Sequence, residues 1–219
     1  TANTVSKVNQ SHGHGLSMVW TNTLSYDFNI ATEHHINALI GSELYTYDGS
    51  NTEGSNTGLI PGFDDWDHAY LVNTNGTENK TVKGSPYDST RGMSYFARLG
   101  WTWKERYMVN ATMRADGSSK FAKGNRWGYF PSVSAGWTIS EEKFMESVKS
   151  WFDFLKIRVS WGQVGNANIN CYQYLAPVST TNTNYNFGSG GGQDAWVTGS
   201  YTSRLANEKV KWETSEQYN

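Results

Sequence analysis

Residues 16–30 read LSMVWTNTLSYDFNI, and their side chains separate by parity into two kinds. The even positions are large and apolar except Asn22, and the odd positions are polar except Val19. Successive side chains of a β-strand point to opposite faces, so the stretch predicts one long strand with an apolar and a polar face. Strands of globular proteins run to about 5–6 residues. A longer one-sided strand is typical of a barrel wall between lipid and a wet interior, where about 9–11 residues cross the bilayer.

The same alternation recurs at six later places in the chain. Further strands are predicted at residues 36–47, 93–103, 107–115, 130–139, 155–161 and 210–218. About seven strands cannot close a barrel, because bacterial examples use even numbers of eight or more. The sequence therefore predicts an all-β fold in which residues 1–219 form one arc of a larger antiparallel transmembrane barrel. A chain end inside the last predicted strand favours an internal piece of a longer protein.

The connections between the predicted strands alternate in length. Short connections are expected at residues 32–34, 104–106 and 140–150, and longer polar ones at 48–91, 116–128 and 163–207. The stretch 140–150 predicts one short helical turn, because Glu141 and Glu142 follow Ser140 and acidic residues are favoured at a helix start. Outer-membrane barrels have short periplasmic turns and longer outer loops, so this order fits a barrel.

Composition narrows the class of protein further. Charged residues make up 17% of the 219 residues, below the roughly 25% of a soluble domain, and aromatic residues make up 15%. With a net charge of −2, the chain lacks the excess of basic residues that is typical of proteins that bind nucleic acid. No run of about 18 apolar residues is present, so a membrane-spanning helix is excluded. Cys171 is the single cysteine, so the chain forms no internal disulfide.

Three runs carry a family resemblance. Residues 94–144 read SYFARLGWTWKERYMVNATMRADGSSKFAKGNRWGYFPSVSAGWTISEEKF, and residues 155–166 read LKIRVSWGQVGN. With VKWETSEQYN at 210–219, they resemble the SusC/RagA family of TonB-linked outer-membrane transporters, which is typical of Bacteroidetes. Residues 111–137 are the most specific part. The family also has a plug and a TonB-box, and neither is recognised in this chain.

The resemblance implies a transport role in the outer membrane. Members import oligosaccharides or peptides together with a SusD-like lipoprotein that caps the outer opening. TonB supplies the energy through the plug, and the barrel wall contacts outer-membrane lipid. The resemblance implies no covalent chemistry, so we expect no enzyme activity and no cofactor.

Two groups of residues are candidates for contact with cargo. The polar strand faces predict residues that face a wet lumen or the plug, namely Arg98, Asn110, Thr112, Arg114, Ser134 and Arg158. The two long loops carry aromatic and acidic candidates, namely Asp64, Asp65, Trp66, Asp67, Trp196 and Tyr201. Aromatic faces stack on sugar rings while carboxylates accept hydroxyl hydrogen bonds, and loops often carry function. The alternative for the loop group is ordinary packing and solvation.

Other conspicuous residues have a structural interpretation. A set of aromatic residues is expected to face lipid or form girdles at the membrane boundaries: Trp20, Tyr26, Trp101, Trp103, Tyr107, Trp137, Trp151 and Trp161. The turn pairs Asp116-Gly117 and Gly124-Asn125 predict turn geometry for the loop 116–128. The cations of that loop, Lys120, Lys123 and Arg126, are expected to be solvated or to contact lipopolysaccharide phosphates.

A metal site, a surface hydrolase and a soluble binding module are the alternatives to the importer. The acidic cluster at 64–67 lacks the spacing of an EF-hand, and the histidines lack that of a zinc site, so no metal is predicted. A surface hydrolase is disfavoured because no paired carboxylates or triad stand out. A soluble all-β glycan-binding module is the main alternative. It would require the apolar faces to pack on one another, making the chain soluble without detergent.

Overall fold

The computed structural model describes residues 5–63, 65–78, 80–148, 151, 153–180, 183–186 and 196–219. In this part the chain forms strands and short 3-10 helices and no α-helix. It divides into two compact units. The first unit is Thr1–Val19 with Tyr45–Arg91, and the second is Trp20–Leu44 with Gly92–Asn219. The strands β1 (Lys7–Ile30) and β2 (His34–Thr57) contribute residues to both.

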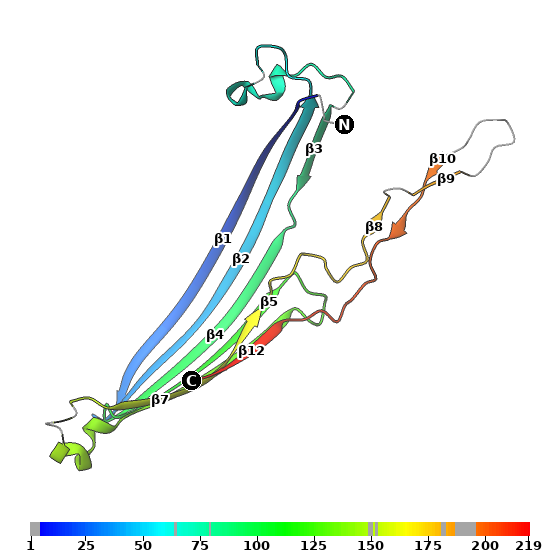
Figure 1. Cartoon of the computed structure of the whole chain (residues 1–219). Helices are drawn as coiled ribbons and strands as arrows, with labels where there is room; N and C mark the ends of the chain where they lie inside the picture. Colours follow the sequence, from blue (N-terminus) through cyan, green and yellow to red (C-terminus); the bar gives the residue numbers. More distant parts are fainter. Residues whose placement is uncertain are drawn as a thin grey trace. The chain divides into compact units, whose positions relative to one another are not determined.

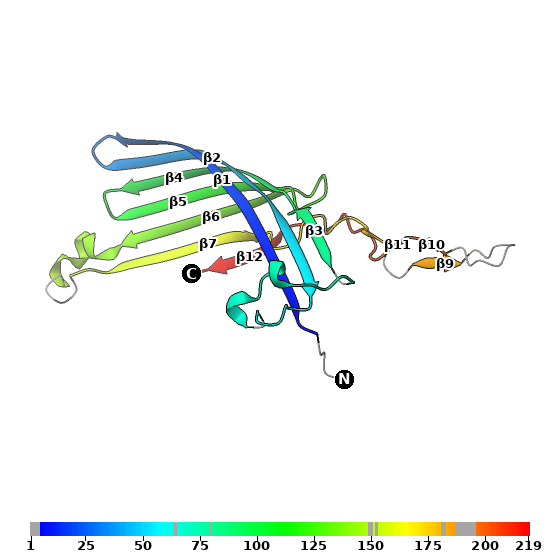
Figure 2. The same cartoon turned by 90° about the horizontal axis from the view of Figure 1, so that it is seen from above.

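The second unit is built on an antiparallel sheet. Its later strands are β4 (Thr90–Trp103), β5 (Tyr107–Ser118), β6 (Trp127–Thr138), β7 (Lys156–Asn166) and β12 (Glu213–Tyr218). The strand order is β1-β2-β4-β5-β6-β7-β12 (Figure 1). If the short strands β3 and β8 to β11 are left out, each strand of this path pairs with the strand that follows it in the sequence. Figure 2 shows β4 to β7 lying side by side. This meander confirms the predicted all-β, antiparallel fold class.

The register of the sheet collects the apolar residues on one face. Leu99 of β4 lies opposite Ala111 of β5, and Ala111 lies opposite Val133 of β6. Val133 in turn lies opposite Trp161 of β7. Directly opposed residues share a face, so these rows form a continuous apolar surface across four strands.

Nothing in the described part of the chain covers this apolar face. The side chains of Leu99 and Val159 are 54% and 58% exposed, and Trp20 and Leu24 on β1 are more exposed still. Contiguous apolar surface of this extent marks a membrane or protein interaction site. It also counts against a soluble sandwich, whose two apolar faces would bury each other.

The buried apolar residues of the second unit gather around the connection 119–126. Phe121, in the connection 119–126, is completely buried, and Phe130 is 7% exposed. The ring of Trp212 lies 5.3 Å from that of Phe121 and 5.4 Å from that of Phe130. The Trp212 indole N–H donates to the carbonyl oxygen of Arg126 at 2.9 Å. This cluster joins the connection 119–126 to the end of the long connection that precedes β12.

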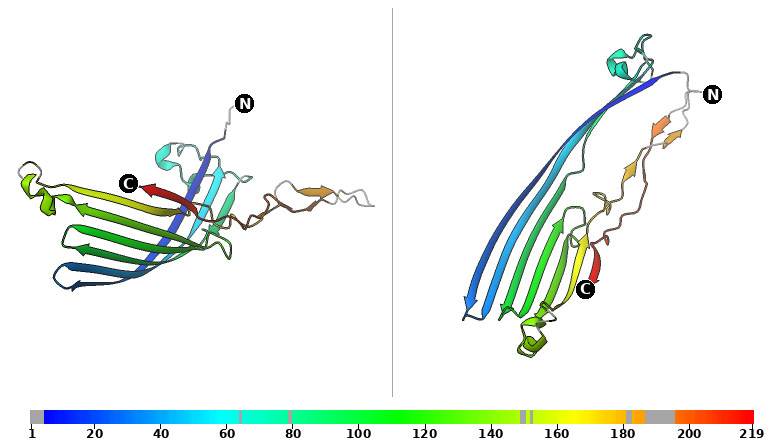
Figure 3. Two further views of the ribbon diagram at one scale, coloured as in Figure 1. Left: turned by 90° about the horizontal axis from the view of Figure 1, so that it is seen from below. Right: turned by 60° about the vertical axis from the view of Figure 1, so that its left-hand side comes forward.

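The connection between β7 and β12 contains two short two-stranded antiparallel sheets, one enclosed in the sequence by the other. Strand β8 (Val178–Ser179) pairs with β11 (Tyr201–Thr202), and β9 (Asn184–Asn186) pairs with β10 (Trp196–Thr198). Figure 3 shows them projecting beyond the ends of β7 and β12.

The first unit is a smaller sheet with one structured loop. Strand β3 (Thr81–Pro86) pairs with the second half of β2 from Ser50 to Ser55. The loop between β2 and β3 contains two 3-10 helices, η1 (Trp66–His68) and η2 (Leu71–Asn73).

The predicted elements are found, with shifted boundaries. Strands β1 and β2 extend well beyond residues 16–30 and 36–47, and β12 begins at Glu213 rather than at residue 210. The predicted helical turn at 140–150 consists of two 3-10 helices, η3 (Ile139–Glu141) and η4 (Lys143–Val148). No helix in the described residues has the length and apolarity needed to cross a membrane.

Candidate functional site

The polar face of the sheet holds a charged network centred on Arg114. Its Nε donates to both carboxylate oxygens of Asp116, at 2.8 and 2.9 Å, and one terminal nitrogen donates to Ser94 Oγ at 3.1 Å. A terminal nitrogen also lies 3.6 Å from Glu43 on β2. The guanidinium group lies 5.5 Å from the Phe96 ring centroid. One arginine thus links strands β2, β4 and β5 on this face.

The polar positions of β1 are joined to β2 by side-chain hydrogen bonds. Asn37 donates to Asp27 at 2.7 Å, and Thr21 donates to Glu43 at 3.4 Å. Because Glu43 also pairs with Arg114, the odd positions of β1 share a face with the polar residues of β4 and β5. The alternation in residues 16–30 therefore places the polar side chains of β1 on the same face of the sheet as those of β2, β4 and β5.

The remaining predicted lumen residues gather around a polar hollow. Its volume is about 730 Å³, and Asn110, Thr112 and Ser134 are among the side chains that line it. Arg98 donates to Asn110 Oδ1 at 3.4 Å. Arg158 of β7 lies opposite Gly136 of β6, two residues along from the cross-strand pair Ser134 and Ser160. Among the described residues, Arg158 has no hydrogen-bond or ion-pair partner. The sheet thus brings together the predicted set, although whether it faces a lumen stays a prediction.

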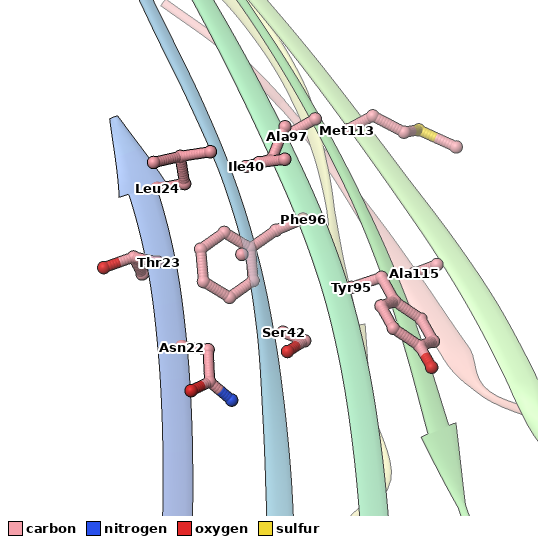
Figure 4. Close-up of a pocket in the computed structure, with 11 residues that line it drawn as sticks. Asn22, Thr23, Leu24, Ile40, Ser42, Tyr95, Phe96, Ala97, Met113 and Ala115 are labelled. Carbon is pink, nitrogen blue, oxygen red and sulfur yellow. The ribbon is translucent and has the colours of Figure 1, made fainter. Parts of the chain in front are cut away.

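A second hollow, of about 560 Å³, is mainly apolar. Leu24, Ile40, Phe96 and Met113 are among the residues that line it. Figure 4 shows the Phe96 ring lying over β2. A Cβ atom on Gly41 would overlap that ring. Glycine at this position therefore leaves room for the Phe96 ring, which the guanidinium group of Arg114 contacts.

The loop candidates are not brought together in one unit. Asp65, Trp66 and Asp67 lie at η1 in the first unit, and Asp64 lies outside the described residues. Trp196 contributes backbone to β10, and Tyr201 pairs with Ser179 in the short sheet of β8 and β11, both in the second unit. Their predicted contact with cargo stays a prediction.

The first unit holds a hollow that the sequence did not indicate. Its volume is about 830 Å³, and its lining includes Lys7, Glu53, Glu78 and Lys83. These residues lie in stretches without apolar alternation. Their convergence depends on the pairing of β2 with β3, which places Glu53 opposite Lys83. The only available signal was the density of polar residues in these stretches.

Aromatic residues stack at the short-turn end of the sheet. The ring of Tyr107 lies 5.2 Å from that of Trp103 and 6.3 Å from that of Trp137. Three donors converge on Glu142 at η3: Tyr107 Oη at 2.5 Å, Trp137 Nε1 at 3.1 Å and Arg106 at 3.4 Å. The hydrogen bond from Tyr107 is the main reason that the pKa of Glu142 lies below its ordinary value, with Trp137 and the charge of Arg106 acting in the same direction.

This arrangement predicts a pH-dependent loss of stability in a Glu142→Gln variant. A carboxyl whose folded pKa is lowered stabilises the fold above its ordinary pKa of 4.5 and loses that effect as pH falls through the lowered value. The melting temperature of Glu142→Gln should therefore fall furthest below wild type at neutral pH, and the gap should narrow below pH 4.5. Glu146→Gln, at an exposed site in η4, is the control. A gap that does not change with pH would contradict this role for Glu142.

The fold and the polar face define a class of protein. An antiparallel meander with an uncovered apolar face and a hydrogen-bonded polar face has the architecture of part of a transmembrane barrel wall. The model of the family described as TonB dependent receptor-like, beta-barrel, matches residues 2–219. The chain belongs to this family, whose members are outer-membrane transport proteins rather than enzymes.

Individual relatives agree with this assignment. The chain is 41% identical over 130 residues to TonB-dependent receptor SusC of Bacteroides thetaiotaomicron, a match covering 58% of this chain and 12% of that protein. It is 32% identical over 197 residues to TonB-dependent receptor P26 of Formosa agariphila, covering 89% of this chain and 18% of that protein. The chain thus spans less than a fifth of the length of these relatives.

Solved structures show the same fold. The structure of the RagAB peptide importer in the 'open-open' state matches with a TM-score of 0.79 at 23% identity. The match covers the whole of this chain and 22% of the matched one. These findings confirm the predicted resemblance to SusC/RagA-type transporters.

Proposed function

We propose that residues 1–219 form one arc of the barrel domain of an outer-membrane importer. The importer takes up oligosaccharides or peptides with energy from TonB and with a SusD-like lipoprotein as its partner. The observation that carries this proposal is the two-faced sheet: apolar residues left uncovered on one face, and charged and polar side chains joined to one another on the other.

The two faces have different roles in this proposal. The apolar face contacts lipid, and the stacked aromatic residues near Tyr107 lie at the membrane boundary, where aromatic girdles occur. The polar face lines the wet interior, where the hollow beside Asn110 and Ser134 lies next to Arg98 and Arg158. Cargo or plug would meet these side chains.

One solved neighbour supports a peptide cargo, and the oligosaccharide alternative and the lipoprotein partner are proposed from the family resemblance. SusC is a TonB-dependent receptor, and RagAB is a peptide importer. Since the chain spans less than a quarter of these proteins, plug, TonB-box and partner are proposed from the family rather than from residues of this chain.

The proposal is tested by extending the gene in both directions and deleting it. The reading frame should continue into a plug upstream and further alternating strands downstream, with a lipoprotein gene beside it. The deletion strain should lose growth on one class of oligosaccharide or peptide, and loss of TonB should abolish the same growth. Stop codons close to both ends of the chain, with a product soluble without detergent, would instead favour the glycan-binding module.

A further inference from the structure

The long connection between β7 and β12 is paired with itself. The backbone N–H of Asn207 donates to the carbonyl oxygen of Tyr174 at 3.0 Å, and that of Ser203 donates to the carbonyl oxygen of Pro177 at 3.0 Å. Further out, β8 pairs with β11 and β9 pairs with β10. We refer to the described residues 168–180, 183–186 and 196–211 as the arm. Backbone hydrogen bonds thus join the two branches of the arm to each other.

The arm buries little apolar surface of its own. The side chains of Val178 and Leu205 are 66% and 85% exposed. A segment with few buried apolar contacts opens at a low free energy. The position of the arm relative to the sheet therefore depends on how its two ends are held.

Both ends of the arm contact the connection 119–126, which joins β5 to β6. Lys120 Nζ donates to the carbonyl oxygen of Ala167, at the end of β7, at 3.4 Å. Asn125 Nδ2 donates to the carbonyl oxygen of Glu208 at 2.6 Å. Because Glu208 directly follows Asn207, this second contact begins where the backbone pairing of the arm ends. One short connection thus holds both ends of a much longer one.

Trp212 gives the second of these ends a buried seat. Its ring packs against the rings of Phe121 and Phe130, and its indole N–H donates to the carbonyl oxygen of Arg126 at 2.9 Å. A Cβ atom on Gly128 would lie 2.9 Å from Cγ of Trp212, so glycine leaves room for the ring. A buried indole that packs on two rings and also finds an acceptor for its N–H is held in one orientation.

We infer that the connection 119–126 and Phe130 form a clasp that sets the position of the arm, with Trp212 as the positioning residue seated in it. With Trp212 in place, the arm keeps one position relative to the sheet. Without it, the arm swings as one body while its own pairing persists. The proposed function enters only to place the clasp on the outer side of the barrel, where the longer connections lie. The test measures distances rather than transport, so its failure would leave the proposed function standing.

The test measures the distance between the arm and the sheet in the full receptor in lipid nanodiscs. Nitroxide labels are placed on cysteines that replace Tyr129 on β6 and Leu205 on the arm, which are 61% and 85% exposed, and the other cysteines are changed to serine. Pulsed electron paramagnetic resonance should give a narrow distance distribution for the otherwise unchanged receptor. Trp212→Ala should broaden it about twofold, because an end with few buried contacts samples more positions.

Two controls make the measurement specific to the clasp. Trp212→Phe keeps an aromatic ring in the seat, so the distribution should stay close to that of the unchanged receptor. A second label pair, at Tyr129 and Val159, lies within the sheet, on β6 and β7. Its distribution should be the same with and without Trp212→Ala.

Hydrogen exchange separates a swinging arm from an unfolded one. In Trp212→Ala the backbone amides of Ser203 and Asn207 should exchange at the wild-type rate, because their acceptors lie within the arm. If Trp212 acted only by keeping the arm folded, exchange at both amides would accelerate.

Three results would overturn the clasp. The first is an unchanged distribution in Trp212→Ala, and the second is a wild-type distribution as broad as that of the variant. The third is faster exchange at Ser203 and Asn207. If Trp212→Ala does not fold, Asn125→Ala is measured instead, because it removes the hydrogen bond to Glu208 and leaves the aromatic rings in place. It should also broaden the distribution, and a wild-type width there would contradict the clasp.

Discussion

Replacing Phe121 with alanine is expected to lower the free energy of unfolding by about 3–5 kcal/mol, the cost of truncating a buried phenylalanine. The Phe121 ring is completely buried and packs on Trp212. Alanine would leave a cavity where the connection 119–126 meets the end of the connection before β12. Urea unfolding of the full receptor in bilayers measures the loss, and limited proteolysis after residue 167 should accelerate in parallel.

The control for Phe121→Ala is Phe144→Ala in η4. The side chain of Phe144 is 63% exposed, so its truncation should change stability by less than about 0.5 kcal/mol. Equal effects of the two substitutions would show that the Phe121 cluster does not stabilise the protein.

Replacing Val159 with arginine is expected to cost about 2–4 kcal/mol, because a cation would be placed on the lipid face near mid-bilayer. Val159 is 58% exposed and lies opposite Ala135 in the apolar rows of the sheet. In a soluble protein an exposed valine would tolerate this change, so the cost arises only if lipid covers the face. Leu99→Arg on β4 should behave in the same way.

The matched control is Ser134→Arg, one residue away from Ala135 but on the polar face. Ser134 lines the polar hollow, where water can solvate the new guanidinium group. The expected change is less than about 1 kcal/mol, since substitutions at hydrated positions are usually mild. Comparable losses at Val159 and Ser134 would contradict the assignment of the two faces.

Alternation predicted the part of each strand that has one apolar face. The strands at 93–103 and 107–115 were found almost as predicted because Leu99, Trp101 and Val109 alternate with polar residues. The additional length of β1 and β2 could not be predicted in the same way. Residues 7–15 and 48–57 are polar on both faces, so only their pairing shows that they are strands.

The loop 116–128 shows where sequence reasoning is incomplete. Gly124 has φ of +102°, as its turn pair predicts. The expected solvation of the loop was only partly right, because Lys120 donates to the carbonyl oxygen of Ala167 and Arg126 to that of Phe121. The burial of Phe121 depends on Trp212, which is distant in the sequence, and no local pattern reveals such a contact.

The candidate site was predictable to a similar degree. Parity placed Arg98, Asn110, Thr112 and Arg114 on one face, and the cross-strand contacts agree. The partners of Arg114 could not be named beforehand, since pairing with Glu43 depends on the register of β2 against β4. A shift of one residue would have moved every side chain to the other face.

The most direct test of the central claim compares two neighbouring residues of β6. Single cysteines at Ser134 and Ala135, in a receptor whose other cysteines including Cys171 are changed to serine, would carry a fluorescent label in bilayers. Nitroxide groups on the lipid chains should quench the label at 135 and leave the label at 134 bright, while aqueous iodide should do the reverse. Equal quenching at both sites, or the opposite pattern, would contradict a barrel wall with these two faces.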